Sequence, residues 1–308
     1  MLIERVLRRV AARMPRGVRY LLGGTYANVL REYTFAGADF LSFWNRLRRT
    51  EWASREDLER LQWRKFKVLL AHAYRSVPFY RRRFAEAGVT PDDIVTHADL
   101  VRIPPLRRED VRRHPEDLLA DGVRVADLFL KKTSGSTGDS LHVYHDRSCY
   151  VSMRAAVARW RTLAGCDPFR SRVAATGVYG PARPSERRRF TRYDPVHHVL
   201  YLPSTTLNPE TLREYVAELR AFRPHILQGV ASTFYAIACH MKERGMRGVR
   251  ARAVLPSGDH LLPRHRELLE SVFGAPVYDT YGMIERTASA AECSQHEGMH
   301  LDMELCLV

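Results

Sequence analysis

Apolar side chains in the first 120 residues follow the spacing of helices. Between Leu58 and Ala73 they recur every three or four positions, which places them on one face of a helix. Ser54 precedes this run as a suitable N-cap, and the pair Val77-Pro78 predicts its end. The pattern therefore predicts a helical N-terminal region over residues 1–120 that packs on the rest of the chain.

After residue 120, short apolar runs alternate with helical patterns. This alternation predicts an α/β core with a substantially parallel sheet over residues 121–308. A final run at residues 303–308 also has the pattern of a strand. The other predicted strands are residues 126–130, 141–144, 172–178, 225–227, 252–255 and 276–278, and the predicted helices are residues 148–163, 209–222, 232–244 and 261–273.

The composition is that of a globular protein with an excess of positive charge. Of the 308 residues, 45% are hydrophobic and 27% are charged, and the formal net charge is +14. Such a charge suits nucleic acid, an anionic membrane surface or anionic small substrates. The arginines are spread along the chain, and no nucleic-acid-binding motif accompanies them. We therefore expect a basic solvated surface and no nucleic-acid partner.

Cysteines and apolar runs bear on the location of the protein. The five cysteines are odd in number and widely scattered, which argues against a disulfide framework and favours a cytoplasmic protein. No run of 18 apolar residues is present, so no transmembrane segment is expected. Residues 1–22 are basic and amphipathic, which permits weak contact with a membrane surface; a helix packed on its own domain is the favoured reading.

One loop concentrates glycines and hydroxyl groups after a predicted strand, in the sequence KKTSGSTGDS that begins at Lys131. Backbone N–H groups and hydroxyls at such a turn suit phosphate oxygens. The loop does not fit the Walker phosphate loop or the nucleophile elbow of lipases. By itself it is as consistent with a plain turn as with a phosphate site. The residues in question are Thr133, Ser134, Gly135, Ser136, Thr137 and Gly138.

Two later segments favour a nucleotide site. VYDTYGMIE, residues 277–285, places a tyrosine four residues before a carboxylate. The tyrosine ring can stack on a purine, and the carboxylate can hold a metal ion bound to phosphates. SGDHL, residues 257–261, also follows a predicted strand and exposes backbone near a glycine.

Together the three segments resemble the adenylate-forming ligase superfamily, in particular its phenylacetate–CoA ligase branch and the capsular polysaccharide biosynthesis relatives. The turn QGVAS at residues 228–232 and the tail ECSQHEGMH at residues 292–300 are also similar to that branch. The resemblance implies the large N-terminal α/β domain of the AMP-binding fold. It also implies ATP-dependent activation of a small carboxylic acid to an acyl-adenylate, with coenzyme A as an acyl acceptor.

The resemblance also implies roles for individual residues. Residues 133–138 would hold the β- and γ-phosphates of ATP, and Tyr281 would stack on adenine. Glu285 would be the catalytic residue that binds Mg²⁺. The remaining adenine-pocket residues would be Ser257, Gly258, Asp259, Asp279, Thr280 and Gly282, and the carboxylate side would be lined by Gly229, Val230, Ala231 and Ser232.

Three features depart from the family pattern. Asp139 adds negative charge after the glycine loop, and Ile284 lacks the hydroxyl that the family usually places there. The chain also ends at Val308, before the mobile C-terminal domain of the family, so that domain is expected to be absent. The alternatives are a truncated, non-catalytic nucleotide- or acyl-binding protein and, more distantly, a basic nucleic-acid-binding protein.

Several other candidates receive less weight. Cys293, His296 and His300 have the side chains of a zinc site, but their spacing is not that of a standard finger. The pair His197-His198 lacks the acid that acyl-transfer enzymes place downstream, so a loop or strand edge is expected. The aromatic residues Phe40, Phe43, Trp44 and Trp52 are expected to pack in the protein rather than line a ligand site.

Overall fold

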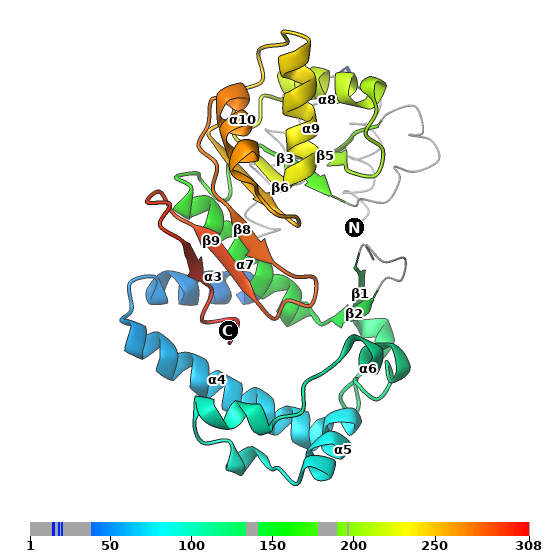
Figure 1. The fold of residues 1–308 in the computed structure, drawn as a ribbon, viewed down its shortest axis with the longest axis vertical. Coiled ribbons are helices and arrows are strands. Elements are labelled where there is room, and N and C mark those ends of the chain that lie inside the picture. The colour runs from blue at the N-terminus through cyan, green and yellow to red at the C-terminus, as the bar shows by residue number, and fades with distance from the viewer. Residues whose placement is uncertain are drawn as a thin grey trace. The chain divides into compact units, whose positions relative to one another are not determined.

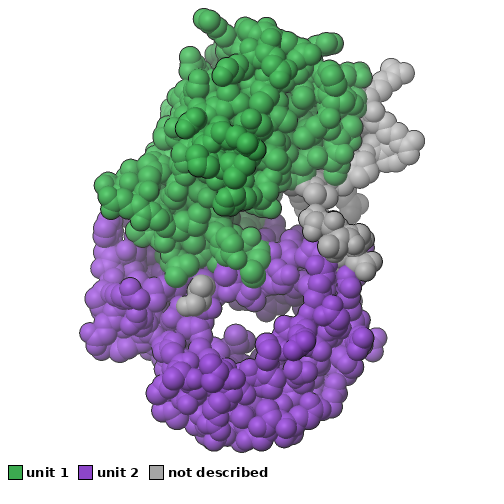
Figure 2. All heavy atoms as spheres, viewed as in Figure 1, with its two compact units in different colours: residues 1–45, 154–283, 289–301 green, residues 46–153, 284–288, 302–308 purple. Residues whose placement is uncertain are grey.

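A computed structural model describes Met14, Pro15, Val18, Tyr20 and residues 38–133, 141–177, 190–195 and 197–307. The chain forms two compact units, which Figure 2 distinguishes by colour. Unit 1 comprises residues 1–45, 154–283 and 289–301, and unit 2 comprises residues 46–153, 284–288 and 302–308. The division into a helical region at residues 1–120 and an α/β core stays a prediction. Residues 1–22 lie almost entirely outside the described part of the chain.

Unit 1 contains a five-stranded sheet of order β4-β5-β3-β6-β7, of which Figure 1 labels β3, β5 and β6. Neighbouring strands are parallel except for the β4–β5 pair, which is antiparallel. This confirms the α/β class that the alternation of patterns predicts. The strands are β3 Val173–Gly177, β4 Arg192–Asp194, β5 Val199–Pro203, β6 Ile226–Val230 and β7 Ala253–Ser257.

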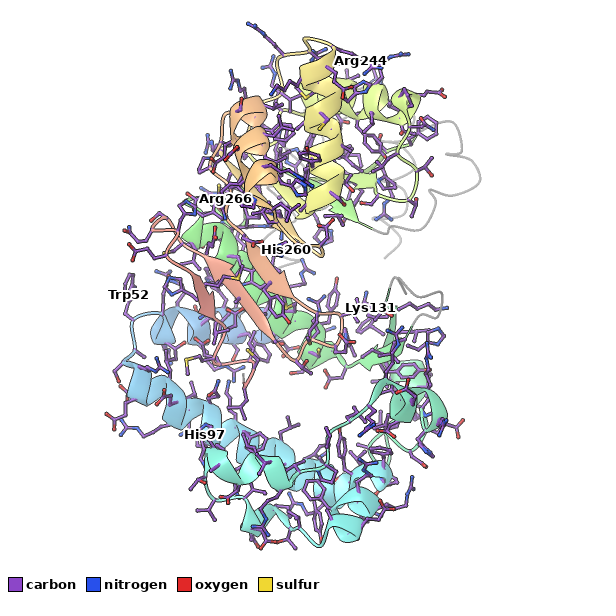
Figure 3. All side chains as sticks on the ribbon, viewed as in Figure 1. Trp52, His97, Lys131, Arg244, His260 and Arg266 are labelled. Carbon is purple, nitrogen blue, oxygen red and sulfur yellow. The ribbon has the colours of Figure 1, made fainter. Side chains whose placement is uncertain are left out.

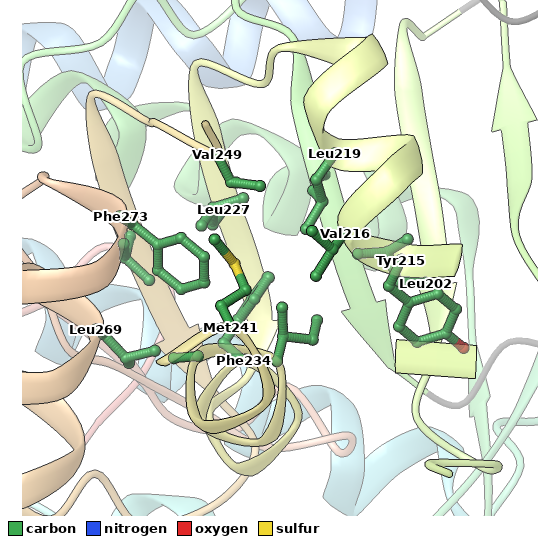
Figure 4. Close-up of a cluster of buried hydrophobic side chains, with 14 of the residues drawn as sticks. Leu202, Tyr215, Val216, Leu219, Leu227, Phe234, Met241, Val249, Leu269 and Phe273 are labelled. Atoms are coloured by element: carbon green, nitrogen blue, oxygen red, sulfur yellow. The ribbon is translucent and has the colours of Figure 1, made fainter. Parts of the chain in front are cut away.

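Three helices pack on one face of this sheet: α8 Pro209–Phe222, α9 Ala231–Glu243 and α10 Pro263–Phe273. Figure 4 shows the core between them, where Val216, Phe234 and Leu269 from the helices meet Leu227 of β6. These four side chains are fully buried. Removing so many large side chains from water is the main favourable contribution to the stability of this unit.

The opposite face of the sheet is contacted by α7 Arg147–Leu163, which belongs to unit 1 from Arg154 onward. The guanidinium of Arg161 donates two hydrogen bonds, of 3.0 and 2.8 Å, to the side-chain oxygen of Gln228. Gln228 follows Leu227 in β6, so successive side chains point to opposite faces and bind different helices.

A second sheet in unit 1 has the order β10-β9-β8 and is antiparallel. Its strands are β8 Thr280–Gly282, β9 Ser289–Glu292 and β10 Met299–Leu301. The strand expected at residues 276–278 is reduced to a single parallel bridge between Val277 and Val254. The strand expected at residues 303–308 is wrong: residues 303–305 form a turn, in which the N–H groups of Leu305 and Cys306 donate to the carbonyl oxygen of Asp302.

The helical part of unit 2 follows the predicted pattern closely. Its helices are α4 Arg55–Ser76, α5 Pro78–Ala87 and α6 Arg108–Arg113. The hydroxyl of Ser54 accepts a hydrogen bond from the N–H of Asp57, which confirms Ser54 as the N-cap of α4. A small core of Leu70, Phe84, Val89 and Ile94 joins α4 to α5 and the segment that follows.

Unit 2 also contains the hairpin of β1 Phe129–Lys132 and β2 His142–His145. The two strands flank the glycine loop, as predicted. The first strand begins three residues later than expected, because Val125–Asp127 forms a 3₁₀ turn.

The aromatic side chains near residue 40 are partly explained by packing. The helix α3 Ala38–Thr50 places the rings of Phe40 and Trp44 against Phe169, at centroid distances of 5.9 and 5.3 Å. Trp52 lies beyond this helix and is 90% exposed (Figure 3), so its expected packing role is wrong.

His197 and His198 lie in the turn between β4 and β5, as expected. None of the helices in the described parts of the chain is long and apolar enough to cross a membrane.

Candidate functional site

Three of the predicted site segments meet at one edge of the sheet in unit 1. Strands β6 and β7 are parallel, so Val230 and Ser257 lie side by side where the two strands end. The hydroxyl of Thr280 donates a 2.6 Å hydrogen bond to the carbonyl oxygen of Pro256, which places β8 at the same edge. In α/β sheets, ligands bind at the carboxyl ends of parallel strands. Segments separated by up to 50 residues in the sequence therefore come together where a ligand would bind.

Gly229 lies where the backbones of β6 and β3 approach each other closely at this edge. Its φ is +129°, a conformation that L side chains rarely adopt. A Cβ atom on this residue would lie 2.1 Å from the carbonyl oxygen of Thr176 on the neighbouring strand. Gly229 thus lets β6 approach β3 closely and turn into α9 at Val230.

Asp259 holds the first turn of α9 from a different segment. Its carboxylate accepts hydrogen bonds from the N–H groups of Ala231, at 2.8 Å, and Ser232, at 3.0 Å. The N-cap residue Val230 makes no side-chain capping bond of its own. Asp259 therefore caps the N-terminus of α9, and its hydrogen bonds join the SGDHL segment to the turn at residues 229–232.

Replacing Asp259 tests this capping role. The change Asp259→Ala leaves the N–H groups of Ala231 and Ser232 without their acceptor, so we expect the free energy of unfolding to fall by about 1–2 kcal/mol. Asp259→Asn keeps one acceptor oxygen and should recover part of the loss. Urea unfolding followed by circular dichroism measures both variants, and equal stability of Asp259→Ala and wild type would contradict the role.

The β8 segment presents an exposed aromatic ring. Tyr281 is 49% exposed, and among the described residues its side chain has no hydrogen-bond partner and its ring has no aromatic partner. Gly282 beside it lies near Trp160, whose Cη2 atom would be 3.8 Å from a Cβ atom on the glycine. An exposed tyrosine face is the feature that base stacking requires.

Asp279 precedes this ring in a half-buried position. Burial raises the pKa of Asp279, and the nearby charge of Glu292 raises it further. A hydrogen bond from the Thr280 backbone and the charges of Arg266 and His260, which Figure 3 labels, oppose that rise in pKa without cancelling it. The carboxyl group of Asp279 is therefore easier to protonate than an exposed aspartate.

Sequence reasoning missed the residue that organises this segment. Glu292 is 9% exposed and accepts hydrogen bonds from Nη2 of Arg266, at 2.8 and 3.0 Å, and from the N–H of Asp279, at 2.9 Å. Burial alone would raise the pKa of Glu292, but these bonds and the one to His296 outweigh burial and lower it. Arg266 lies 26 residues before Glu292, on α10, and no local spacing signals the pair.

The zinc hypothesis at the same segment finds no support. The Nδ1 atom of His296 lies 3.1 Å from the Glu292 carboxylate, and its ring stacks on Tyr278 at a centroid distance of 5.0 Å. Among the residues that the structure describes, no group of three or more histidine, cysteine or acidic side chains could hold a metal ion. The contact that the structure gives to His296 is therefore with Glu292.

The glycine loop, which is predicted to bind phosphate, and the proposed metal ligand belong to unit 2. Two hydrogen bonds join Thr133 to Leu141, the residues on either side of the segment 134–140. Residues 134–140, including Ser134, Gly135, Ser136, Thr137 and Gly138, lie outside the described residues. Lys131 and Lys132 lie on β1, directly before Thr133.

Glu285 is half-buried in the segment 284–288 of unit 2. None of the described residues forms an ion pair or hydrogen bond with its carboxylate. The preceding Ile284 is held by His145 of β2, whose Nε2 atom lies 2.8 Å from the Ile284 carbonyl oxygen. A carboxylate without a protein cation, on a segment anchored to the glycine-loop hairpin, is suited to binding an added cation.

Comparison with known proteins agrees with this geometry. The chain is 21% identical to a 2-hydroxyisobutyryl-CoA ligase crystallised with 2-HIB-AMP and CoA, with a TM-score of 0.63 over 80% of this chain and 54% of that one. This chain has the adenylate-forming ligase fold. The resemblance predicted from the sequence is therefore confirmed.

Curated proteins are also similar to parts of this chain. The chain is 35% identical to phenylacetate-coenzyme A ligase of Escherichia coli (strain K12) over 119 residues, 38% of this chain and 27% of the relative. It is 22% identical to protein CapK of Staphylococcus aureus over 242 residues, 78% of this chain and 53% of CapK. The chain thus spans about half the length of these relatives, or less. No family model matches it.

Proposed function

We propose that this chain binds ATP and a small carboxylic acid and takes part in forming an acyl-adenylate. A carboxylate oxygen attacks the α-phosphorus of ATP, the new P–O bond forms, and the bond to the β-phosphate breaks to release pyrophosphate. The thiol sulfur then attacks the acyl carbon, the C–S bond of a thioester forms, and the acyl C–O bond to the phosphate breaks to release AMP; coenzyme A is the proposed thiol. A link to polysaccharide biosynthesis, which the sequence resemblance implies, is part of the same proposal.

The observation that carries this proposal is the exposed ring of Tyr281 at the carboxyl edge of the sheet. It lies on the strand that Thr280 joins to β7, and the turn at residues 229–232 lies at the same edge. Adenine stacking on Tyr281 is therefore compatible with a pocket shaped by Asp279, Gly282 and residues 257–259. Gly229, Val230, Ala231 and Ser232 remain the proposed lining on the carboxylate side.

A magnesium ion and phosphate contacts are part of the same proposal. Glu285 offers a half-buried carboxylate without a cationic partner among the described residues. Bound Mg²⁺ would neutralise charge on the phosphates of ATP. Thr133 and the loop up to Gly138 remain the proposed contacts for the β- and γ-phosphates, with Lys131 and Lys132 adding positive charge.

Calorimetric titration with Mg·ATP tests the proposal. We expect saturable binding by wild type and a loss of about 1–3 kcal/mol in the Tyr281→Ala variant, because alanine removes the stacking face. Tyr281→Phe keeps the face and should bind like wild type. Equal affinity of all three proteins would contradict the assignment of Tyr281 to adenine.

Turnover distinguishes the proposal from its alternative. A panel of small carboxylic acids, assayed for pyrophosphate release with and without coenzyme A, should identify an acid that is activated. Saturable ATP binding without pyrophosphate release from any acid would favour a nucleotide- or acyl-binding protein instead. Binding that depends on salt as steeply as nucleic-acid binding does, and that AMP does not compete, would contradict both.

A further inference from the structure

The edge of the sheet in unit 1 that lies opposite the candidate site carries a row of basic residues. Strands β3, β6 and β7 are parallel and begin in register. The residues directly before them are Arg172, His225 and Arg252, joined by hydrogen bonds from the N–H of His225 to the Arg172 carbonyl oxygen, at 2.8 Å, and from the N–H of Arg252 to that of His225, at 2.7 Å. Neighbouring strands lie about 4.8 Å apart, so the two arginines begin about 10 Å from each other. We call this the amino edge.

The segments that lead into these three strands are rich in arginine. They are residues 164–172 before β3, 223–225 before β6 and 244–252 before β7, and together they contain seven arginines and one acidic residue. The acidic residue is Asp167, whose Oδ1 atom accepts hydrogen bonds from the N–H groups of Phe169, at 2.8 Å, and of the next residue, at 2.7 Å. These segments therefore carry a surplus of six positive charges.

Helix ends offset only part of this surplus. The helices α7, α8 and α9 end directly before the three segments, so their C-termini lie at the amino edge. The C-terminus of a helix carries about half a negative charge, and three helices supply about 1.5. Most of the positive charge at the amino edge therefore faces solvent without compensation from the described part of unit 1.

The arginines nearest the strands lie close to one another. None of the described residues forms an ion pair with Arg172, Arg223 or Arg252. The Nε atom of Arg172 donates a 2.7 Å hydrogen bond to the carbonyl oxygen of Arg223, which places these two residues side by side. Burial lowers the pKa of Arg172, and the charges of Arg252 and Arg223 lower it further. Guanidinium groups stay charged at neutral pH, so a partner with negative charge would relieve their mutual repulsion.

The surroundings of the amino edge favour one class of anionic partner. The aromatic residue of the three segments is Phe169, whose ring packs against Phe40 and Trp44, so nucleic-acid bases find no exposed ring to stack on. None of the large hydrophobic side chains in these segments is exposed, so little apolar surface is available to a bilayer. A single phosphate group has three acceptor oxygens, too few for arginines spread over three segments.

An acidic protein surface matches these features. Its carboxylates are separate groups, so each can meet a different arginine. A guanidinium binds a carboxylate through two parallel N–H bonds, and arginine is enriched at protein interfaces. A second copy of this chain does not fit, because its formal net charge of +14 would oppose association.

We propose that the amino edge of unit 1 is an interaction surface for an acidic partner protein, with Arg172, Arg223 and Arg252 at its centre. The edge lies at the opposite ends of the strands from Val230 and Ser257, so a bound partner leaves the candidate site open. This inference goes beyond the proposed function and does not depend on it.

The test is a titration of a fluorescently labelled peptide of ten glutamates with the full chain, followed by fluorescence anisotropy. The double variant Arg223→Gln/Arg252→Gln removes two exposed charges from the amino edge. We expect its affinity for the peptide to fall about fivefold or more. Wild-type affinity should also fall as salt is added, because salt screens exposed charges.

A matched control removes two exposed arginines from the other ends of the helices. Arg213 lies in the second turn of α8, and Arg264 lies in the first turn of α10. Arg213→Gln/Arg264→Gln should bind the peptide within about twofold of wild type. Equal losses in the two double variants, or no binding of the peptide by wild type, would overturn the proposal.

Two further probes identify the class of partner. A duplex oligonucleotide and vesicles of anionic lipid present phosphates in place of carboxylates. If Arg223→Gln/Arg252→Gln loses more affinity for either of these probes than for the peptide, the amino edge binds phosphate and the proposal is wrong. A loss of affinity that is largest for the peptide supports it.

A titration with Mg·ATP separates this inference from the proposed function. Arg223→Gln/Arg252→Gln should bind Mg·ATP like wild type, because the amino edge and Tyr281 lie at opposite ends of the strands. A weaker affinity for Mg·ATP in this variant would contradict the separation of the two sites. Failure of wild type to bind Mg·ATP would count against the proposed function alone.

Discussion

Replacing Gly229 with alanine is expected to cost at least about 4 kcal/mol of unfolding free energy, or to prevent folding of unit 1. The new Cβ atom would lie 2.1 Å from the carbonyl oxygen of Thr176 and 2.8 Å from its Oγ1 atom. Relief requires β6 to move away from β3 in the centre of the sheet, because the nearest atom belongs to the backbone. A φ of +129° adds strain for any L side chain.

The control for this experiment is Gly245→Ala, also in unit 1. Gly245 follows α9 with a φ of +60°, and a Cβ atom there would meet nothing within 4 Å. This change should cost only about 1 kcal/mol, the strain of the left-handed conformation. Urea unfolding of both variants measures the difference, and a loss below about 1 kcal/mol for Gly229→Ala would show that the strands separate easily.

The second large effect is expected for Arg266→Ala. Arg266 forms the ion pair with Glu292 and also donates a hydrogen bond to the carbonyl oxygen of Val277. The side chains of Arg266 and Glu292 are 28% and 11% exposed, so removal of the arginine leaves a buried carboxylate with fewer partners. We expect a loss of about 3 kcal/mol in the free energy of unfolding.

The matched control is Arg244→Ala, an exposed arginine of unit 1 that Figure 3 also labels. Its contact with Glu243 is 3.6 Å long, and both side chains are largely exposed. Exposed pairs contribute little, so we expect a change of about 0–1 kcal/mol. Similar losses for Arg244→Ala and Arg266→Ala would contradict the structural role of the buried pair.

The loss of unfolding free energy caused by Arg266→Ala should depend on pH, and the pKa of Glu292 determines the direction. The pKa of Glu292 is lowered in the folded protein, so its contribution to stability is present above the pKa of the unfolded state, about 4.3. The contribution is lost as pH falls through the lower, folded-state pKa. The difference in unfolding free energy between wild type and Arg266→Ala should therefore be largest at neutral pH and become smaller in acid. A difference that is constant from pH 7 to below pH 4 would argue against an ionic interaction.

Local patterns in the sequence determined most of the longer elements of this protein. The predicted helix at residues 209–222 matches α8 at both ends, and Ser54 caps α4 as predicted. Both predictions succeed because helical periodicity and capping depend on residues within a few positions of one another. The ordered motifs also indicated the adenylate-forming ligase fold, because each motif is a short, contiguous segment.

The contacts that shape the candidate site were decided only by the tertiary structure. Asp259 caps a helix that begins 28 residues earlier, and Arg266 pairs with a glutamate 26 residues later. The strands β8 and β10 have three residues each, too few to produce a recognisable alternation. Such features depend on which distant segments the fold brings together, and a single sequence does not encode that proximity in its local pattern.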